Sequence, residues 1–211
     1  MNGQFRYLAV GEINEIYISV LVRSIFASMV SIFIPVYLLV MQVPLHLIAT
    51  YYIIKSLFGI PLSFAIQKSM RHFSEPMLMV CSAALFVVFL LSLGSVELTL
   101  PTLAALAIII EASELLFWVP FHSLFAHKSY DGKRERESEF GVVHGIFSFA
   151  PMMSPLIAAL IILHLGYGSL FIVASAGLML SVGPLFLVSR ENKEDGEIGM
   201  PCSRPNTFLK G

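Results

Sequence analysis

Four ionisable residues stand inside long apolar stretches of the chain, and they are the first candidates for chemistry. They are Arg23, Lys55, Glu111 and Glu114. A charge at the centre of a bilayer costs about 2.5–3.5 kcal/mol on insertion scales, so such groups pair with one another or face a water-filled cavity. A carboxylate beside a cation can bind and release a proton. We therefore interpret these residues as candidate substrate-binding or proton-binding groups.

The formal charges of the four residues sum to zero, and their spacing favours a specific pair. At about 1.5 Å rise per helical residue, Lys55 and Glu114 lie at similar depths, roughly 18 Å from the same side. Glu111 and Glu114 are three residues apart and share a helix face, which Trp118 continues. We predict a Lys55–Glu114 pair, with Arg23 at a depth of roughly 10 Å and able to exchange partners with Lys55. The alternative is an inert ion pair that only ties helices together.

The composition shows which solvent surrounds these residues. The 211-residue chain is 57% hydrophobic and 13% charged, with a mean hydropathy of +0.83. A soluble domain has about 25% charged residues, so this chain could not cover its apolar surface in water. An ordinary cytosolic enzyme, a nucleic-acid binder and a disordered segment are excluded. Cys81 and Cys202 form neither a disulfide framework nor a metal site, and we expect no cofactor.

The apolar stretches predict an all-α polytopic membrane protein with six transmembrane helices in one bundle. The turn Gly166-Tyr167-Gly168 separates the last two spans. Barrel strands are excluded because the stretches are apolar on every face. Residues 1–15 are then an N-terminal segment, and 190–211 are a polar tail. The six predicted spans are 16–41, 45–67, 75–95, 99–126, 140–165 and 167–189.

The basic residues predict the orientation of the bundle. Apart from Arg23 and Lys55, all of the 13 Lys and Arg residues fall on one side of the predicted spans. The opposite connections carry only His46, Glu97 and His164 as ionisable residues. Because cytoplasmic loops are enriched in Lys and Arg, we expect both termini to be cytoplasmic. The predicted location is the cell membrane (plasma or inner), crossed several times.

The charge distribution among the spans predicts a repeat. Spans three and six have no charged residue in their interiors, whereas spans one, two and four do. A 3+3 repeat whose third members pack outside against lipid produces this pattern. His122 and His144 lie near helix ends, where a hydrogen-bonding interfacial role is favoured over a proton relay.

Span five has its own pattern of small residues and prolines. Small side chains at intervals of four let a helix backbone approach its neighbour closely, and proline adds a bend. Ordinary close packing explains the pattern without any function. The residues concerned are Gly141, Ala150, Ser154, Pro155, Ala158 and Ala159.

This spacing resembles the G-x8-G-x3-GP-x2-GG pattern in the amino-terminal half of major facilitator superfamily transporters. The connection 63–72 resembles a degenerate G-x3-D-R-x-G-R-R/K motif, in which Lys68 and Arg71 keep the positive charges of a gating site. Ser63, Gln67 and Met70 replace the Gly, Asp and Gly of that motif. Span four lacks the R-x2-Q-G motif of the family.

The resemblance covers roughly residues 12–190 and implies half of a secondary active transporter. It would move a small-molecule substrate by alternating access, with proton coupling as one way to drive it. The resemblance also implies a partner, either a missing second six-helix half or a second copy of the chain. Residues 190–211 would then be the start of a central cytoplasmic loop.

Two other classes compete with the transporter hypothesis. A substrate-binding membrane subunit of an energy-coupling-factor-type importer also has about six spans, but we find no ligand-specific loop. A membrane-embedded enzyme needs a nucleophile with its base, or metal ligands at matching depth. The sequence contains no G-x-S-x-G, H-E-x-x-H or acidic metal cluster, so we expect neither an enzyme nor a metal site.

Overall fold

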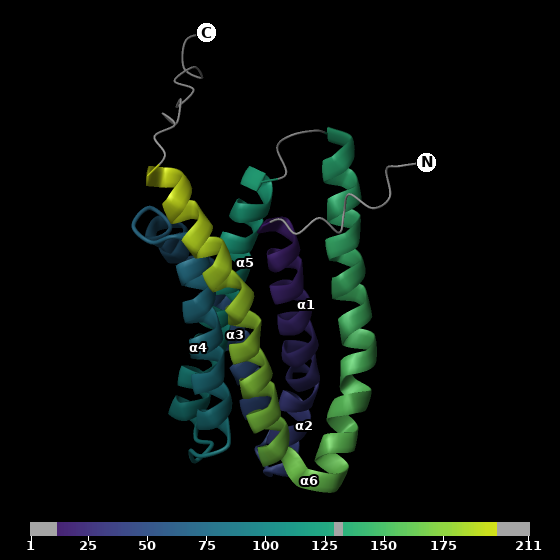
Figure 1. The fold of residues 1–211 in the computed structure, drawn as a ribbon. Coiled ribbons are helices and arrows are strands. Elements are labelled where there is room, and N and C mark those ends of the chain that lie inside the picture. The colour runs from purple at the N-terminus through teal and green to yellow at the C-terminus, as the bar shows by residue number, and fades with distance from the viewer. Residues whose placement is uncertain (1–11, 129–132, 198–211) are drawn as a thin grey trace.

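The computed structural model describes residues 12–128 and 133–197, and every element in these ranges is a helix. The all-α prediction is therefore confirmed for the described part of the chain (Figure 1). The elements are α1 (Glu12–Ser31), α2 (Phe33–Val40), α3 (Leu45–Ser69), α4 (Glu75–Leu93), α5 (Leu100–Lys128) and α6 (Lys133–Glu197).

Five described segments are long and apolar enough to cross a membrane, which makes the chain a multi-pass membrane protein by helix length and hydropathy. The last of them contains Gly166, whose φ of 81° and ψ of 175° interrupt α6. Glycine adopts a positive φ without steric strain, and the chain reverses direction there (Figure 1). The predicted six spans and the five segments differ at this turn, which divides α6 into limbs 133–165 and 167–197. The five segments are Ile18–Val40, Leu45–Ser69, Glu75–Leu93, Leu100–Ser123 and Ser148–Gly183.

The first predicted span, 16–41, is broken into α1 and α2. Pro35 lies four residues after Ser31, where α1 ends. Proline has no N–H to donate to the carbonyl four residues earlier, and its ring crowds that carbonyl. The helical bonding therefore lapses at Ile32, although Ile32 keeps helical dihedral angles (φ −70°, ψ −32°).

The charged connection predicted at 127–139 is much shorter in the structure. α5 continues to Lys128 and α6 begins at Lys133, while the second limb of α6 runs past residue 189 to Glu197. The added turns are rich in Lys, Arg and Glu, which are good helix formers and need no burial. Residues 1–11, 129–132 and 198–211 lie outside the described residues. They include most of the predicted N-terminal segment, 1–15, and most of the predicted tail, 190–211.

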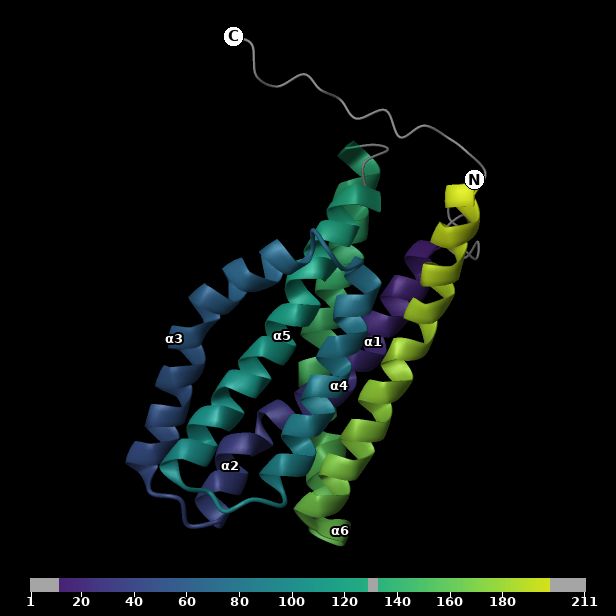
Figure 2. The ribbon, with the colours of Figure 1, turned by 90° about the vertical axis from the view of Figure 1, so that its left-hand side faces the viewer.

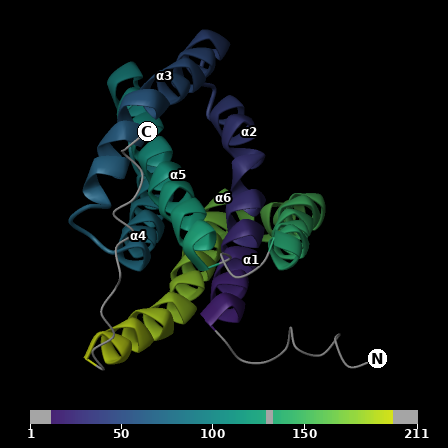
Figure 3. The ribbon, with the colours of Figure 1, turned by 90° about the horizontal axis from the view of Figure 1, so that it is seen from above.

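The helices form a bundle with two distinct ends (Figure 2). The start of α1, the α3–α4 connection and the end of α6 lie at one end, and the α2–α3 and α4–α5 connections and the turn within α6 lie at the other (Figures 1 and 2). α1 packs mainly on α6, α3 on α5, and α4 on both α5 and α6. Viewed along the bundle, α1 and α2 lie between α3 and the first limb of α6 (Figure 3).

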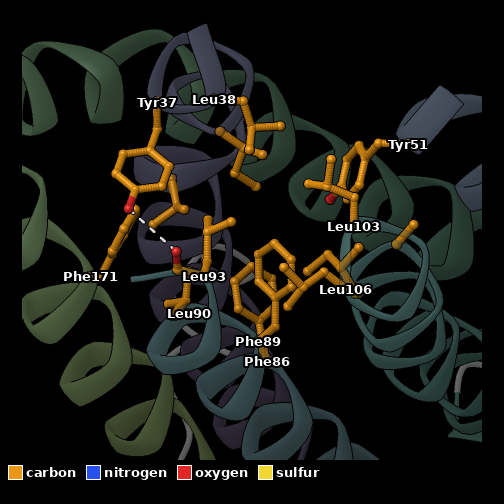
Figure 4. Packing of buried hydrophobic residues seen from close by; sticks show 14 of the residues in the cluster. Tyr37, Leu38, Tyr51, Phe86, Phe89, Leu90, Leu93, Leu103, Leu106 and Phe171 are labelled. Carbon is orange, nitrogen blue, oxygen red and sulfur yellow. Dashed lines mark hydrogen bonds between the residues drawn. The ribbon is translucent and has the colours of Figure 1, made fainter. Parts of the chain in front are cut away.

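The apolar core joins α2, α4, α5 and the second limb of α6 (Figure 4). Tyr37 of α2 packs edge-on against Phe171, with ring centroids 5.1 Å apart, and donates a hydrogen bond of 3.3 Å to the carbonyl of Leu93. Phe89 and Leu90 of α4 are fully buried beside them. Half of the α4 span is buried, more than for any other described span, and this side packs on α5 and α6. Its other side, with Met77, Val88 and Leu91, is exposed, so the peripheral position of span three stays a prediction.

A reciprocal pair of hydrogen bonds joins α4 to α5 within the membrane span. Ser82 Oγ donates to the carbonyl of Ser113 at 2.7 Å, and Ser113 Oγ donates to the carbonyl of Ser82 at 3.0 Å. Both serines are fully buried. Each hydroxyl thus has a partner in a place without water, and the pair sets the rotation of α5 against α4.

Small residues allow close packing of both limbs of α6. Ala150, Ser154 and Ala158 are buried at successive intervals of four on the first limb, and Ala158 packs against Met29 of α1. On the second limb, a Cβ added to Gly177 would overlap the ring of Phe26.

Candidate functional site

A cavity of about 310 Å³ opens between α1, α3 and α5. Its polar wall is formed by Arg23, Ser24, Ser28 and Ser31 of the first span and by Lys55 and Glu114. This volume lies at the lower end of the roughly 300–1,000 Å³ of small-molecule sites. A cavity of this size, with charged groups inside a membrane bundle, suits a small polar solute.

Lys55 and Glu114 form the ion pair that their depths predict. The Nζ of Lys55 lies 2.9 Å from Oε2 of Glu114 and 3.9 Å from Oε2 of Glu111. The side chain of Glu114 is 37% exposed, against 15% for Glu111. One lysine thus serves two carboxylates, and the more accessible carboxylate lines the cavity.

Glu111 lies behind the cavity wall, against the backbone of α3. A Cβ added to Gly59 would approach Oε1 of Glu111 to 2.8 Å, so glycine leaves the space that this carboxylate occupies. Ser63 donates a hydrogen bond of 2.6 Å to the Gly59 carbonyl, close to Pro61, which lies inside α3. The two predicted carboxylates therefore have different environments, one facing the cavity and the other facing a helix.

Arg23 is paired with neither carboxylate in this structure, and its exchange with Lys55 during a conformational change stays a prediction. It is 5% exposed, and neither ion pair found among the described residues includes it. Its guanidinium carbon lies 4.1 Å from the ring centroid of Phe117 and 5.8 Å from that of Phe86. Such cation–π contacts contribute about 0.5–2 kcal/mol, which offsets only part of the free energy of burying a charge. Nη1 is buried and has no hydrogen-bond partner within the described part of the chain.

Aromatic side chains form the rest of the cavity wall. Tyr51 and Tyr52 of α3 and Phe117 and Trp118 of α5 all line it. Trp118 stacks on the ring of His122 at 5.7 Å, so His122 lies beside this wall rather than in the ion-pair cluster. The wall therefore offers flat apolar surfaces next to charged groups.

Sequence reasoning missed the serines and the tyrosines of this cavity, although a signal was present. Ser24, Ser28 and Ser31 recur at intervals of four and three, which places them on one helix face. Tyr51 precedes Lys55 by one turn on α3 and shares its face. The contact between Arg23 and Phe117 had no such signal, because it depends on how α1 and α5 are rotated.

The gating and packing candidates lie elsewhere. Lys68, in the last turn of α3, and Arg71, in the turn after it, are exposed, and the described ion pairs include neither. On α6, Gly141 and Ala159 are exposed and Pro155 is half-buried, so these three lie off the buried face of the small-residue stripe. The side chain of His144 lies outside the described residues.

Comparison with known proteins does not assign this site to a family. No protein-family model matches the chain, and no curated protein matches it significantly. Within residues that the structure describes, no three His, Cys, Asp or Glu side chains are grouped as metal ligands.

Proposed function

We propose that this chain is half of a secondary active transporter of the major facilitator type, with six spans in a 3+3 arrangement and both termini in the cytoplasm. The supporting observation is the charged cavity inside a multi-pass bundle, which Arg23, Lys55 and Glu114 all line. Intramembrane ionisable residues mark substrate and ion pathways. Apart from Arg23 and Lys55, the described Lys and Arg residues belong to the end of α3 and its connection to α4, the end of α5 and the two ends of α6. These parts lie at one end of the bundle (Figure 1), which supports the proposed orientation.

In this proposal a small solute enters the cavity, and the bundle rocks against a second six-helix unit to expose it to the other side. That unit is either another half or a second copy of the chain. α3 supports such packing, because only 11% of its span is buried and its apolar side chains Ile53, Leu57 and Ile60 are exposed.

Alternating access can be tested without knowing the solute. Ser28 lines the cavity, so a Ser28→Cys variant in a Cys81→Ser/Cys202→Ser background places one thiol there. The protein is reconstituted into sealed vesicles and treated with a membrane-impermeant charged maleimide from outside or from inside. We expect labelling from both sides. Labelling from one side only would contradict alternating access and favour a fixed binding subunit.

A matched control places the thiol on the outer surface of the bundle. Val88 of α4 is 49% exposed and is absent from the cavity wall. In the same background, Val88→Cys should face lipid and remain unlabelled from either side. Labelling of this control would show that the vesicles leak or that the bundle has opened.

Proton coupling is assigned to Glu111 and Glu114, with Lys55 as their counter-charge. Glu114 carries the proton in this proposal, because it lines the cavity and Glu111 does not. We expect Glu114→Gln to abolish proton movement coupled to solute uptake, measured with a pH-sensitive dye inside the vesicles. If the two carboxylates act as one unit, Glu111→Gln should have the same effect. Proton coupling retained in both variants would show that neither carboxylate takes part in the mechanism.

A further inference from the structure

The charges in the cavity are not fully matched by contacts. Lys55 contacts both Glu111 and Glu114, whereas the contacts found for the Arg23 guanidinium among the described residues are with aromatic rings. Arg23 is 5% exposed and lines the cavity, and its buried Nη1 has no hydrogen-bond partner in the described part of the chain. An unsatisfied guanidinium N–H donor in a low-dielectric site is unfavourable. Arg23 is therefore the group in this cavity that still needs an acceptor.

The surroundings of Arg23 restrict what can supply that acceptor. Ser24 and Ser28 line the same side of the cavity, and Phe117 and Trp118 provide flat apolar surface. Arginine matches carboxylate, sulfonate and phosphate groups through parallel N–H donors. A ring beside such a group could stack on the aromatic wall. Arg23 and Lys55 would repel a cation, and a neutral solute could accept a hydrogen bond from the guanidinium but would leave it without a counter-charge.

We propose that the cavity binds a small organic anion with a flat apolar body, and that Arg23 is its counter-charge. This deepens the proposed transporter function by naming the substrate class, and it rests on that function only for movement across the membrane. The same anionic chemistry could come from a phospholipid headgroup, so the test separates the two sources.

The test uses the single tryptophan of the chain as a reporter, because Trp118 lines the cavity. The protein is placed in neutral phosphatidylcholine nanodiscs and titrated with benzenesulfonate, which stays charged and does not cross the bilayer as an acid. We expect a saturable change in Trp118 fluorescence and a rise in Tm. Benzenesulfonamide, the neutral analogue, and benzylammonium, the cation, should cause neither. Equal responses to all three compounds would overturn the proposal.

Variants at Arg23 separate charge recognition from folding. Arg23→Gln should weaken benzenesulfonate binding about tenfold or more, since a charged hydrogen-bonding partner is lost. Arg23→Lys keeps the positive charge and should restore much of the binding, which a purely structural role would not require. If Arg23→Gln does not fold, Arg23→Lys still tests the site: this variant should keep its preference for benzenesulfonate over benzenesulfonamide, and loss of that preference would refute charge recognition.

Lipid is distinguished by adding phosphatidylglycerol to the nanodiscs. If the cavity takes a soluble anion, benzenesulfonate affinity changes little with this lipid. A rise in Tm with phosphatidylglycerol, without any response to benzenesulfonate, would assign Arg23 to a lipid headgroup and overturn the proposal. Benzenesulfonate binding together with labelling of Ser28→Cys from one side only would support the anion site and contradict alternating access. Labelling from both sides without benzenesulfonate binding would support alternating access and overturn the anion site.

Discussion

Replacing Lys55 by Met tests the ion-pair cluster most directly, because it leaves two carboxylates three residues apart without their shared cation. Removing one partner of a fully buried pair costs about 3–5 kcal/mol, whereas an exposed pair contributes about 0–1 kcal/mol. The side chains of Lys55, Glu111 and Glu114 are 23%, 15% and 37% exposed, between these limits. We therefore expect Lys55→Met to destabilise the fold by about 1–3 kcal/mol, or a fall in Tm of about 3–9 °C for a chain of this size.

The assay is a double-mutant cycle on purified protein, with Tm followed by Trp118 fluorescence at one fixed scan rate. The double variant Lys55→Met/Glu114→Gln should lose less free energy of unfolding than the two single variants lose in sum, because the cation and one of its carboxylates are removed together. Lys68→Met is the control: Lys68 is exposed at the end of α3, and its change should stay within about 0.5 kcal/mol. Additive single losses would refute the coupling between Lys55 and Glu114.

Two further changes test the packing of the bundle. Gly177→Ala should destabilise the fold by about 1–3 kcal/mol because its Cβ would overlap the Phe26 ring, whereas Gly183→Ala, with nothing within 4 Å, should be neutral or stabilising in the same thermal scan. Ser82→Ala and Ser113→Ala should each cost about 0.6 kcal/mol, the mean for hydrogen bonds between membrane helices. The double serine variant should lose less than twice that amount in a denaturant titration, and strictly additive losses would mean that the two bonds form independently.

Local patterns in the sequence were enough to predict the apolar helical segments and the Lys55–Glu114 pair. Runs of apolar residues mark the spans, and Gly166 marks the reversal because only glycine reaches its positive φ easily. Lys55 and Glu114 meet because they lie at equal depth on neighbouring helices, which residue counting alone can show.

The parts of the structure that were missed depend on helix rotation and on side-chain contacts distant in sequence. Arg23 lies over the ring of Phe117 rather than beside a carboxylate. The sequence of span one does not indicate how α5 is rotated and therefore where that ring lies. The same applies to α4, which has no interior charge, yet half of its span is buried against the core. A charge-free span is compatible with both lipid and protein surroundings, so hydropathy could not separate them.

Charge balance links the proposed anion site to the carboxylates. Lys55 shared between Glu111 and Glu114 leaves one negative charge in excess, and Arg23 balances it across the cavity. An anion bound at Arg23 would leave that excess uncompensated, and an uncompensated charge is costly at this depth in a bilayer.

A proton on the accessible carboxylate, Glu114, would restore neutrality. The groups around it that also carry or can acquire charge are Tyr51, Tyr52 and Lys55 of α3, Glu111 of α5 and Arg23 of α1. The tyrosines are neutral at physiological pH, so they supply hydroxyl groups rather than a competing charge. One anion and one proton would therefore move together as a neutral pair. Uptake of that pair follows the pH gradient and is indifferent to the membrane potential, which distinguishes it from a site that binds the anion alone.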